Sequence, residues 1–324
     1  MAWRGQRLAA RPRRPEDRRT GRLAGPALAS LILLMLSGCS GVLDPQGPVG
    51  SQDRLIMMDA LVIMLAIVIP TIAATLVFAW WFRSSNGKAR YRPDFVYSGR
   101  IELIVWGIPT LVILFLGGVI WIGSHQLDPA APLALQTPAG GTRTPAVKPI
   151  EVQVVSLDWK WLFIYPDQGV ASVNELVMPV GAPVRFSLTS ASVMNSFFIP
   201  QLGSMMATMN GMTTHLSLQA DKPGNYLGES AQYSGDGFTD MRFAARAVSP
   251  AQFTAWIDAA KSQGPVLDIA AYHELMKQSL DVRPYSYRAV QPGLFEAIAA
   301  RRLPSGPGPT EGRPNPQTSP RPEH

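Results

Sequence analysis

The 324-residue sequence predicts a two-helix transmembrane hairpin, followed by an all-β outer domain and a short helical C-terminal extension. Three observations support this prediction. Two apolar runs among the first 125 residues are each long enough to cross about 30 Å of hydrocarbon at about 1.5 Å per residue. From residue 150 the hydrophobic pattern alternates with a period of two, and after residue 248 it becomes helical.

Residues 1–38 have the composition of a lipoprotein signal peptide. Eight arginines precede or border the apolar run 28–36, which is too short to span a bilayer. The run ends in Leu-Ser-Gly-Cys, which resembles the bacterial lipobox, in which the cysteine becomes the acylated first residue of the mature protein. We therefore expect Cys39, the only cysteine of the chain, to carry lipid. An incidental cysteine at the end of the signal is the alternative.

The formal charge of +6 belongs to this targeting segment and not to a binding face. Residues 1–38 hold eight of the 29 basic residues and two of the 23 acidic ones, which leaves 21 of each sign in the mature chain. A neutral mature chain gives no electrostatic reason to expect a nucleic-acid partner.

Residues 39–125 are predicted to contain the lipidated N-terminus, a polar linker over 40–58, and two transmembrane helices at about 59–82 and 101–123. Five basic residues and one acidic residue lie between Arg83 and Arg100, and this excess places the loop in the cytoplasm. We therefore expect a multi-pass, lipid-anchored protein of the bacterial inner membrane, with its C-terminal domain in the periplasm.

A Pro-, Ala-, Gly- and Thr-rich linker over 126–149 precedes the predicted β-domain, which covers 150–248. Turn residues separate its alternating segments, and several short strands at such spacing are typical of a sandwich or barrel. The clearest predicted strands are 150–159, 184–188, 215–218 and 241–243.

Residues 249–302 are predicted to be an aromatic-rich helical extension. Ser249 and Pro250 have the residue types of an N-cap and a first helical residue for a helix that continues to Lys261. A second helix is expected near 268–280. The Pro-, Gly-, Ser- and Arg-rich residues 303–324 are predicted to be a disordered tail.

Four stretches resemble subunit II of the haem–copper oxidases, whose outer domain is cupredoxin-like. Residues 156–166 (SLDWKWLFIYP) resemble its W-x-W aromatic segment, and 192–200 (SVMNSFFIP) resemble the segment that supplies the first copper-binding histidine. Residues 224–241 keep the frame of its copper loop, and 250–300 resemble the extension of the quinol oxidases. Together they indicate the bo-type ubiquinol oxidase branch of this family.

The resemblance assigns the positions of the binuclear copper (CuA) ligands to residues that are poor copper ligands. The assigned positions are Ser230 and Ser234 for the cysteines, Asn195 and Phe238 for the histidines, Gln232 for the carbonyl donor and Met241 for the thioether. Copper prefers thiolate and imidazole ligands. We therefore expect no metal or cofactor on this chain, and the resemblance implies that haems and copper are bound by a partner, subunit I.

The resemblance implies a non-copper subunit II of a proton-pumping ubiquinol:oxygen oxidoreductase. Without copper the domain cannot relay electrons from a soluble cytochrome, so they must come from a quinol in the membrane. Trp159 matches the position where copper-containing relatives receive electrons, and here we expect it to have a packing role. Subunit I, with subunits III and IV, would be the partners, and no complete active site would lie on this chain.

Glu102 precedes the W-x-x-P motif of Trp106 and Pro109 at the cytoplasmic start of the second predicted span. In the resembled family this glutamate lies at the mouth of a proton channel leading into subunit I. Ionisable residues at the edge of a span are costly and often mark proton paths. The alternative is that Glu102 complements the helix dipole.

Two other functions remain open. Met205, Met206, Met209 and Met212 have thioethers that suit Cu(I), as in a membrane-anchored copper-handling or oxidase-assembly protein on a cupredoxin scaffold. Such methionine clusters more often fill irregular apolar contacts. A cytochrome c oxidase subunit that has lost its copper site is the third candidate.

Overall fold

The computed structural model describes residues 41–90, 94–131, 133 and 148–308. The predicted signal peptide, Cys39 and residues 309–324 lie outside the described residues. The chain divides into two compact units, Met1–Asp44 and Pro45–His324, and every helix and strand named below belongs to the second unit.

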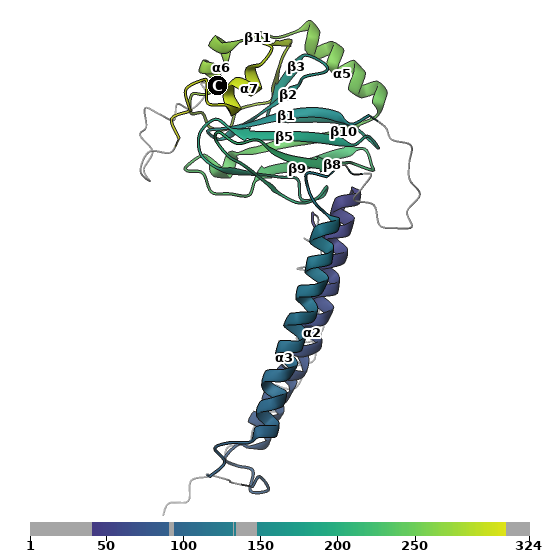
Figure 1. Ribbon diagram of the computed structural model, residues 1–324, viewed down its shortest axis with the longest axis vertical. Helices are drawn as coiled ribbons and strands as arrows, with labels where there is room; N and C mark the ends of the chain where they lie inside the picture. The colour runs from purple at the N-terminus through teal and green to yellow at the C-terminus, as the bar shows by residue number, and fades with distance from the viewer. Residues whose placement is uncertain (1–40, 91–93, 132, 134–147, 309–324) are drawn as a thin grey trace, which may run out of the picture. The chain divides into compact units, whose positions relative to one another are not determined.

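Two long helices, α2 (Pro48–Trp81) and α3 (Gly99–Gln126), are long and apolar enough to cross a membrane. They run side by side (Figure 1). A Cβ on Gly123, near the end of α3, would lie 2.6 Å from Cδ1 of Ile56, near the start of α2. The helices are therefore antiparallel and in close contact at this point, which confirms the predicted hairpin.

Helix α2 begins at Pro48, inside the stretch that the sequence predicted as a polar linker. Its 34 residues measure about 50 Å at about 1.5 Å per residue, more than the hydrocarbon thickness of about 30 Å. The additional first turns contact the β-domain. The Gly50 N–H donates to the carbonyl of Leu202 at 3.0 Å, and Ser204 Oγ donates to Asp53 Oδ2 at 2.9 Å. The polarity of this segment thus reflects a helix outside the hydrocarbon, and the predicted linker was wrong here.

The outer domain contains two mixed β-sheets, with the orders β12-β3-β2-β1-β5-β8 and β4-β10-β9-β6-β7 (Figure 1). The strands of the first sheet, in sequence order, are β1 (Ile150–Leu157), β2 (Lys160–Tyr165), β3 (Val170–Val173), β5 (Val184–Ser190), β8 (Thr214–Leu218) and β12 (Tyr285–Tyr287). Those of the second are β4 (Glu175–Pro179), β6 (Asn195–Phe198), β7 (Met206–Thr208), β9 (Gly224–Ser230) and β10 (Arg242–Val248). The predicted all-β domain is confirmed.

The two sheets pack together through an aromatic core. Trp161 and Phe163 of β2 contact Phe197 of β6 and Phe243 of β10, with ring centroids between 5.0 and 6.3 Å apart. All four side chains are buried. Aromatic pairs at such distances contribute about 0.5–1.5 kcal/mol each beyond their burial. This core holds β6 and β10, which pair with β9 and together with it carry the candidate site.

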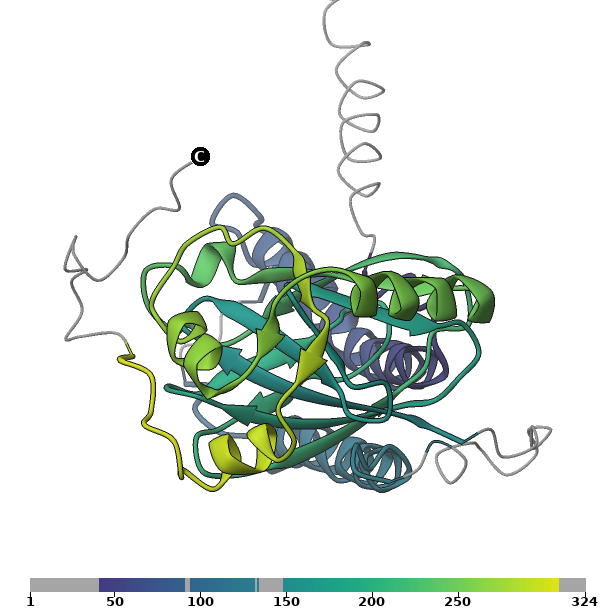
Figure 2. The same cartoon turned by 90° about the horizontal axis from the view of Figure 1, so that it is seen from above.

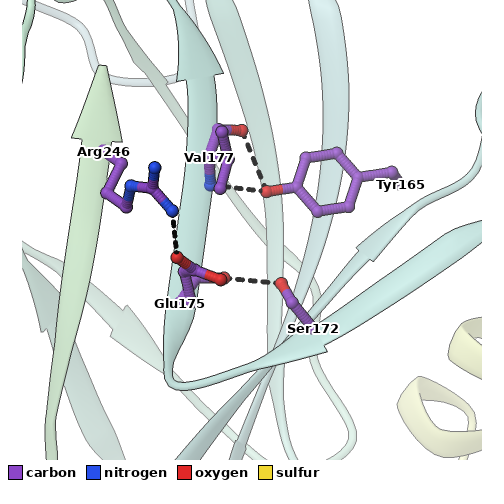
Figure 3. A network of polar contacts seen from close by, with 5 residues as sticks. All are labelled: Tyr165, Ser172, Glu175, Val177 and Arg246. Atoms are coloured by element: carbon purple, nitrogen blue, oxygen red, sulfur yellow. Dashed lines mark hydrogen bonds and ion pairs between the residues drawn. The ribbon is translucent and has the colours of Figure 1, made fainter. Parts of the chain in front are cut away.

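A polar network also joins the sheets (Figure 3). The hydroxyl of Tyr165 on β2 accepts from the N–H of Val177 on β4 at 2.8 Å and lies 2.9 Å from the carbonyl of the same residue. Arg246 pairs with Glu175 at 2.7 Å, and Ser172 Oγ donates to the carbonyl of Glu175. The polar groups at the start of β4 therefore have hydrogen-bond partners in both sheets.

The C-terminal extension packs on the β-domain in two places: its first helix adds Phe253 and Ile257 to the main core, and its later part covers the other face of the first sheet. It contains α5 (Pro250–Ser262), β11 (Val266–Leu267), α6 (Ile269–Leu275), β13 (Ala289–Val290) and α7 (Leu294–Ala299). Leu162 and Ile164 of β2 point away from the aromatic core and belong to a second buried cluster with Tyr272, Leu275 and Phe295 of the extension. Figure 2 shows the green and yellow helices lying across the teal strands. Strand β2 is therefore buried on both faces.

The extension differs from its prediction at two places. Ser249 and Gln252 form the capping box of α5, as the sequence indicated, but α6 ends at Leu275, well before residue 280. Residues 303–308, predicted to begin a disordered tail, are held against the domain at two glycines: the Gly306 N–H donates to the carbonyl of Ala191 at 2.8 Å, and Gly308 is buried. The Pro-, Gly- and Ser-rich composition of this segment does not indicate that its backbone makes specific contacts.

Candidate functional site

The residues at the copper positions gather where β6, β9 and the start of β10 meet. Ser230 Oγ lies 3.1 Å from Oδ1 of Asn195 and 3.2 Å from the carbonyl oxygen of Gln232, so its single proton serves either acceptor. The Ser230 N–H donates to the carbonyl of Met241 at 3.2 Å. Asn195 and Ser230 are both buried.

Ser234 and Met241 complete this group, which we call the copper-position cluster (Asn195, Ser230, Ser234 and Met241). Ser234 Oγ donates a weak hydrogen bond to Met241 Sδ at 3.9 Å, and both residues are buried. The carbonyl of Ser234 accepts a hydrogen bond from Trp159 Nε1 at 3.1 Å. The cluster is thus a closed set of small polar groups and one thioether.

Phe238 and the side chain of Gln232 lie outside the hydrogen-bonded cluster. Phe238 lies on a 3-10 helix, η1 (Phe238–Asp240), and its ring packs edge-to-face on Tyr233 with centroids 5.6 Å apart. Gln232 is exposed and contributes its backbone carbonyl alone. The structure therefore pairs four of the six predicted positions through side chains, Asn195 with Ser230 and Ser234 with Met241. A backbone hydrogen bond from Ser230 to Met241 joins the two pairs, and Gln232 adds its carbonyl.

The residues present do not fit a binuclear copper centre. The hydroxyls of Ser230 and Ser234 are neutral and already hydrogen-bonded within the cluster, and Phe238 has no donor atom. Copper of this type takes thiolates and imidazoles. Across the described residues, no three His, Cys, Asp or Glu side chains are grouped so that they could hold a metal ion. The only cysteine, Cys39, lies outside the outer domain.

Trp159 lies directly beside the loop of the copper-position cluster and is 2% exposed. It is the second residue of the β1–β2 turn and has a φ of 64°, an uncommon conformation for a large side chain. A Cβ on Gly237 would lie 2.4 Å from the indole and 2.5 Å from Leu280. Only glycine lets the loop approach the indole this closely, so Trp159 has the packing environment expected from the sequence.

Two charged residues beside Trp159 were not singled out by the sequence. Asp158 and Lys160 are 4% and 2% exposed. Burial lowers the pKa of Lys160 to about 8, and the nearby Asp158 carboxylate opposes this shift. Fully buried Asp and Lys are rare unless they are paired. The one signal in the sequence was that these two charged residues flank a tryptophan in a turn. It did not indicate their burial, because the charged residues of a turn are normally exposed.

Glu102 lies in the first turn of α3, where it is exposed and its backbone N–H donates to the carbonyl of Ser98 at 3.0 Å. This position satisfies both the proton-path interpretation and the helix-dipole alternative. Among the four clustered methionines, Met205 and Met212 are exposed, whereas Met206 packs against the main core.

Comparison with known families identifies two parts of the chain. The family model described as "Cytochrome C oxidase subunit II, periplasmic domain" matches residues 167–248, which hold the copper-position cluster. The family model described as "COX Aromatic Rich Motif" matches residues 261–301, within the extension.

Three similar proteins match most of the chain. "Ubiquinol oxidase subunit 2" of Acetobacter aceti is 48% identical over 285 residues, 87% of this chain and 88% of that protein. "Cytochrome bo(3) ubiquinol oxidase subunit 2" of Pseudomonas aeruginosa is 47% identical over 83% of this chain and 78% of that protein. "Quinol oxidase subunit 2" of Bacillus cereus is 36% identical over 77% of this chain and 85% of that protein. Since this identity extends over both helices and the outer domain, the chain belongs to the family of ubiquinol oxidase subunit 2, whose outer part is the cupredoxin-like periplasmic domain of cytochrome oxidase subunit II.

Proposed function

We propose that this chain is the copper-free subunit II of a proton-pumping ubiquinol:oxygen oxidoreductase, a terminal oxidase of the aerobic respiratory chain. Electrons come from ubiquinol within the membrane, and haems and copper are bound by subunit I. Subunits III and IV complete the complex. In this role the chain is a scaffold and holds no complete active site.

The donor set of the copper-position cluster is the observation that carries this proposal. An outer domain that relays electrons from a soluble cytochrome needs a redox centre, and the ligands that copper prefers are absent from this cluster. Ser230 instead hydrogen-bonds with Asn195, and Met241 Sδ accepts from Ser234. A quinol donor, which the names of the relatives also support, removes the need for such a relay.

Glu102 is the proposed site of proton uptake. It lies exposed at the start of α3, with Arg100 nearby in sequence, at the end of the hairpin that we assign to the cytoplasm because the adjoining loop is basic. A carboxylate at this edge takes up protons from the cytoplasm and transfers them to a channel in the partner subunit. The family position of this glutamate supports the assignment.

Cys39 is proposed to be lipidated after removal of residues 1–38. The acyl chains would add a third membrane attachment to the two helices of this inner-membrane protein. Intact-mass measurement of the purified chain tests this directly: a mature N-terminus at Cys39 that carries acyl groups supports the proposal, and an unmodified Cys39 contradicts it.

Purification of the native complex through a tag on this chain tests the function. We expect a haem-bearing subunit to co-purify and the complex to consume oxygen with ubiquinol. A copper-handling or assembly protein predicts instead Cu(I) bound by the outer domain and no stable haem protein. Since Met206 is engaged in the main core, the structure gives no specific observation that favours this alternative.

A further inference from the structure

We propose that residues 276–282, which we call the cover segment, form an intrachain cover that closes Trp159 and the copper-position loop to external protein partners. Asp158, Lys160 and Asn174 hold this cover in place. The proposal rests on contacts within this chain and is independent of which donor the complex oxidises.

The cover segment lies in the irregular stretch between α6 and β12. It is held by Lys160 of β2 and by Asn174, which connects β3 to β4. Lys160 Nζ donates to the carbonyl of Lys277 at 2.6 Å and lies 2.5 Å from Ser279 Oγ. Asn174 Nδ2 donates to the carbonyl of Val282 at 2.7 Å. Both ends of the segment are therefore fixed by groups that lie beneath it.

Asp158 ties the cover to the end of the described chain. Its Oδ2 accepts from the backbone N–H of Gly308 at 2.9 Å and from Gln278 Nε2 at 3.3 Å, and its Oδ1 accepts from Ser192 Oγ. Gln278 also donates to the carbonyl of Gly308 at 2.8 Å. One buried carboxylate thus joins the cover segment, the β5–β6 connection and the C-terminal strap of residues 303–308.

The burial of these charges depends on the cover. Leu157 and Lys160 pair across a two-residue turn, and the charged side chains of such a turn normally lie in water. Here Asp158 and Lys160 are 4% and 2% exposed because the cover and the strap lie on them. Burying a charge is costly unless it is paired and hydrogen-bonded, so these contacts form together or are lost together.

Leu280 gives the cover its apolar contact with the site. The Leu280 side chain and the indole of Trp159 approach Gly237 together, so a Cβ there would meet both within 2.5 Å. Trp159 is left 2% exposed. A soluble redox protein therefore cannot reach this indole while the cover is in place, whatever ligands the neighbouring loop carries.

Hydroxyl-radical labelling of the intact complex, read residue by residue by mass spectrometry, tests this proposal. In the wild type we expect Trp159 to be labelled as slowly as the fully buried Trp161 and far more slowly than Tyr233, which is 70% exposed. Labelling of Trp159 at a rate close to that of Tyr233 would overturn the proposal.

Lys160→Met and Asp158→Asn, which we call the clamp variants, each remove hydrogen bonds that hold the cover and approximately keep the side-chain volume. We expect each to raise the labelling rate of Trp159 roughly tenfold or more through local opening, while Trp161 stays protected. Lys277→Ala is the matched control, because its side chain is exposed and the cover is held through its backbone carbonyl. Unchanged labelling in both clamp variants contradicts the proposal.

Leu280→Ala keeps the test decisive if a clamp variant unfolds the domain. It removes apolar contact from the cover and leaves every hydrogen bond of Asp158 and Lys160 in place. We expect selective exposure of Trp159 with Trp161 protected. Protection of Trp159 in this variant, equal to that of the wild type, would show that the cover does not close the site.

Discussion

The carboxylate of Asp158 accepts a hydrogen bond from the backbone N–H of Gly308, 150 residues further along the chain, at 2.9 Å. This contact closes the C-terminal extension onto the first hairpin of the β-domain. The extension is therefore part of the folded domain, covering one face of its first sheet and the turn that contains Trp159.

Lys160 is expected to make the stability of the outer domain depend on pH. Burial lowers its pKa from 10.5 to about 8, so between these values the unfolded chain binds a proton that the folded chain has released. Stability therefore rises with pH in this window, and the cost of the buried charge is fully present below about pH 8. Thermal unfolding of the full chain in detergent between about pH 7.5 and 9.5 measures this rise.

Lys160→Met is the control for the pH effect, since it removes the titrating amine and leaves Asp158 in place. The rise in melting temperature should disappear in this variant. Burial raises the pKa of Tyr165 and Tyr272, which lowers stability above about pH 10, so the window must stop below that value. An equal rise in the variant and the wild type contradicts the role of Lys160.

Tyr165→Phe should destabilise the outer domain by about 1–3 kcal/mol, because it leaves buried polar groups of Val177 without their partner. The ring and its packing on Trp256 are retained. Chemical denaturation of the full chain measures the change. Tyr233→Phe, at a 70% exposed position, is the control and should alter stability by less than about 0.5 kcal/mol. Equal stability of the two variants contradicts this account.

Glu102→Gln should slow oxygen reduction by the assembled complex several-fold while leaving its subunit content unchanged, because the amide cannot bind and release a proton at this site. Asp94→Asn, which changes an exposed acid in the connection between α2 and α3, is the matched control and should keep wild-type turnover. If Glu102→Gln also keeps wild-type turnover, the glutamate complements the dipole of α3 and has no part in proton uptake.

A fourfold variant tests the assignment of the copper positions: Asn195→His, Ser230→Cys, Ser234→Cys and Phe238→His. With Met241 and the Gln232 carbonyl already in place, the outer domain should bind about two copper ions per chain. The control keeps Asn195→His and Phe238→His but carries Ser230→Ala and Ser234→Ala in place of the cysteines, and it should bind no copper. Metal analysis after removal of free copper distinguishes them, and a copper-free fourfold variant with intact fold contradicts the assignment.

Most of the architecture could be predicted from the sequence because hydrophobic period and length determine it. The two apolar runs gave the hairpin, and the alternating segments gave the strands. The start of α2 could not be predicted, since Pro48, Gly50 and the polar residues that follow have the composition of a linker, and the contact of Gly50 with Leu202 is not visible in the sequence. The packing of residues 303–308 was missed for the same reason: backbone hydrogen bonds to Ala191 and Asp158 leave no trace in composition.

The residues of the site could be predicted from the resemblance to subunit II of the haem–copper oxidases, but not from hydrophobic periodicity or composition. Ser230, Asn195 and Met241 carry no metal or catalytic signal by themselves, and only the spacing of the loop brought them together. Asp158 and Lys160 were missed because strand alternation does not reveal that a distant segment will lie on a turn. Their burial arises from the extension, whose contact with β2 is non-local in sequence.

Donor preference of the purified complex is the most direct test of the central claim. Oxygen consumption is measured with ubiquinol and with reduced cytochrome c as separate donors, in the same preparation and at equal haem content. The copper-position cluster predicts rapid turnover with ubiquinol and none above background with cytochrome c. Sustained turnover with cytochrome c would mean that electrons pass through this outer domain by another route, and would contradict the proposed function.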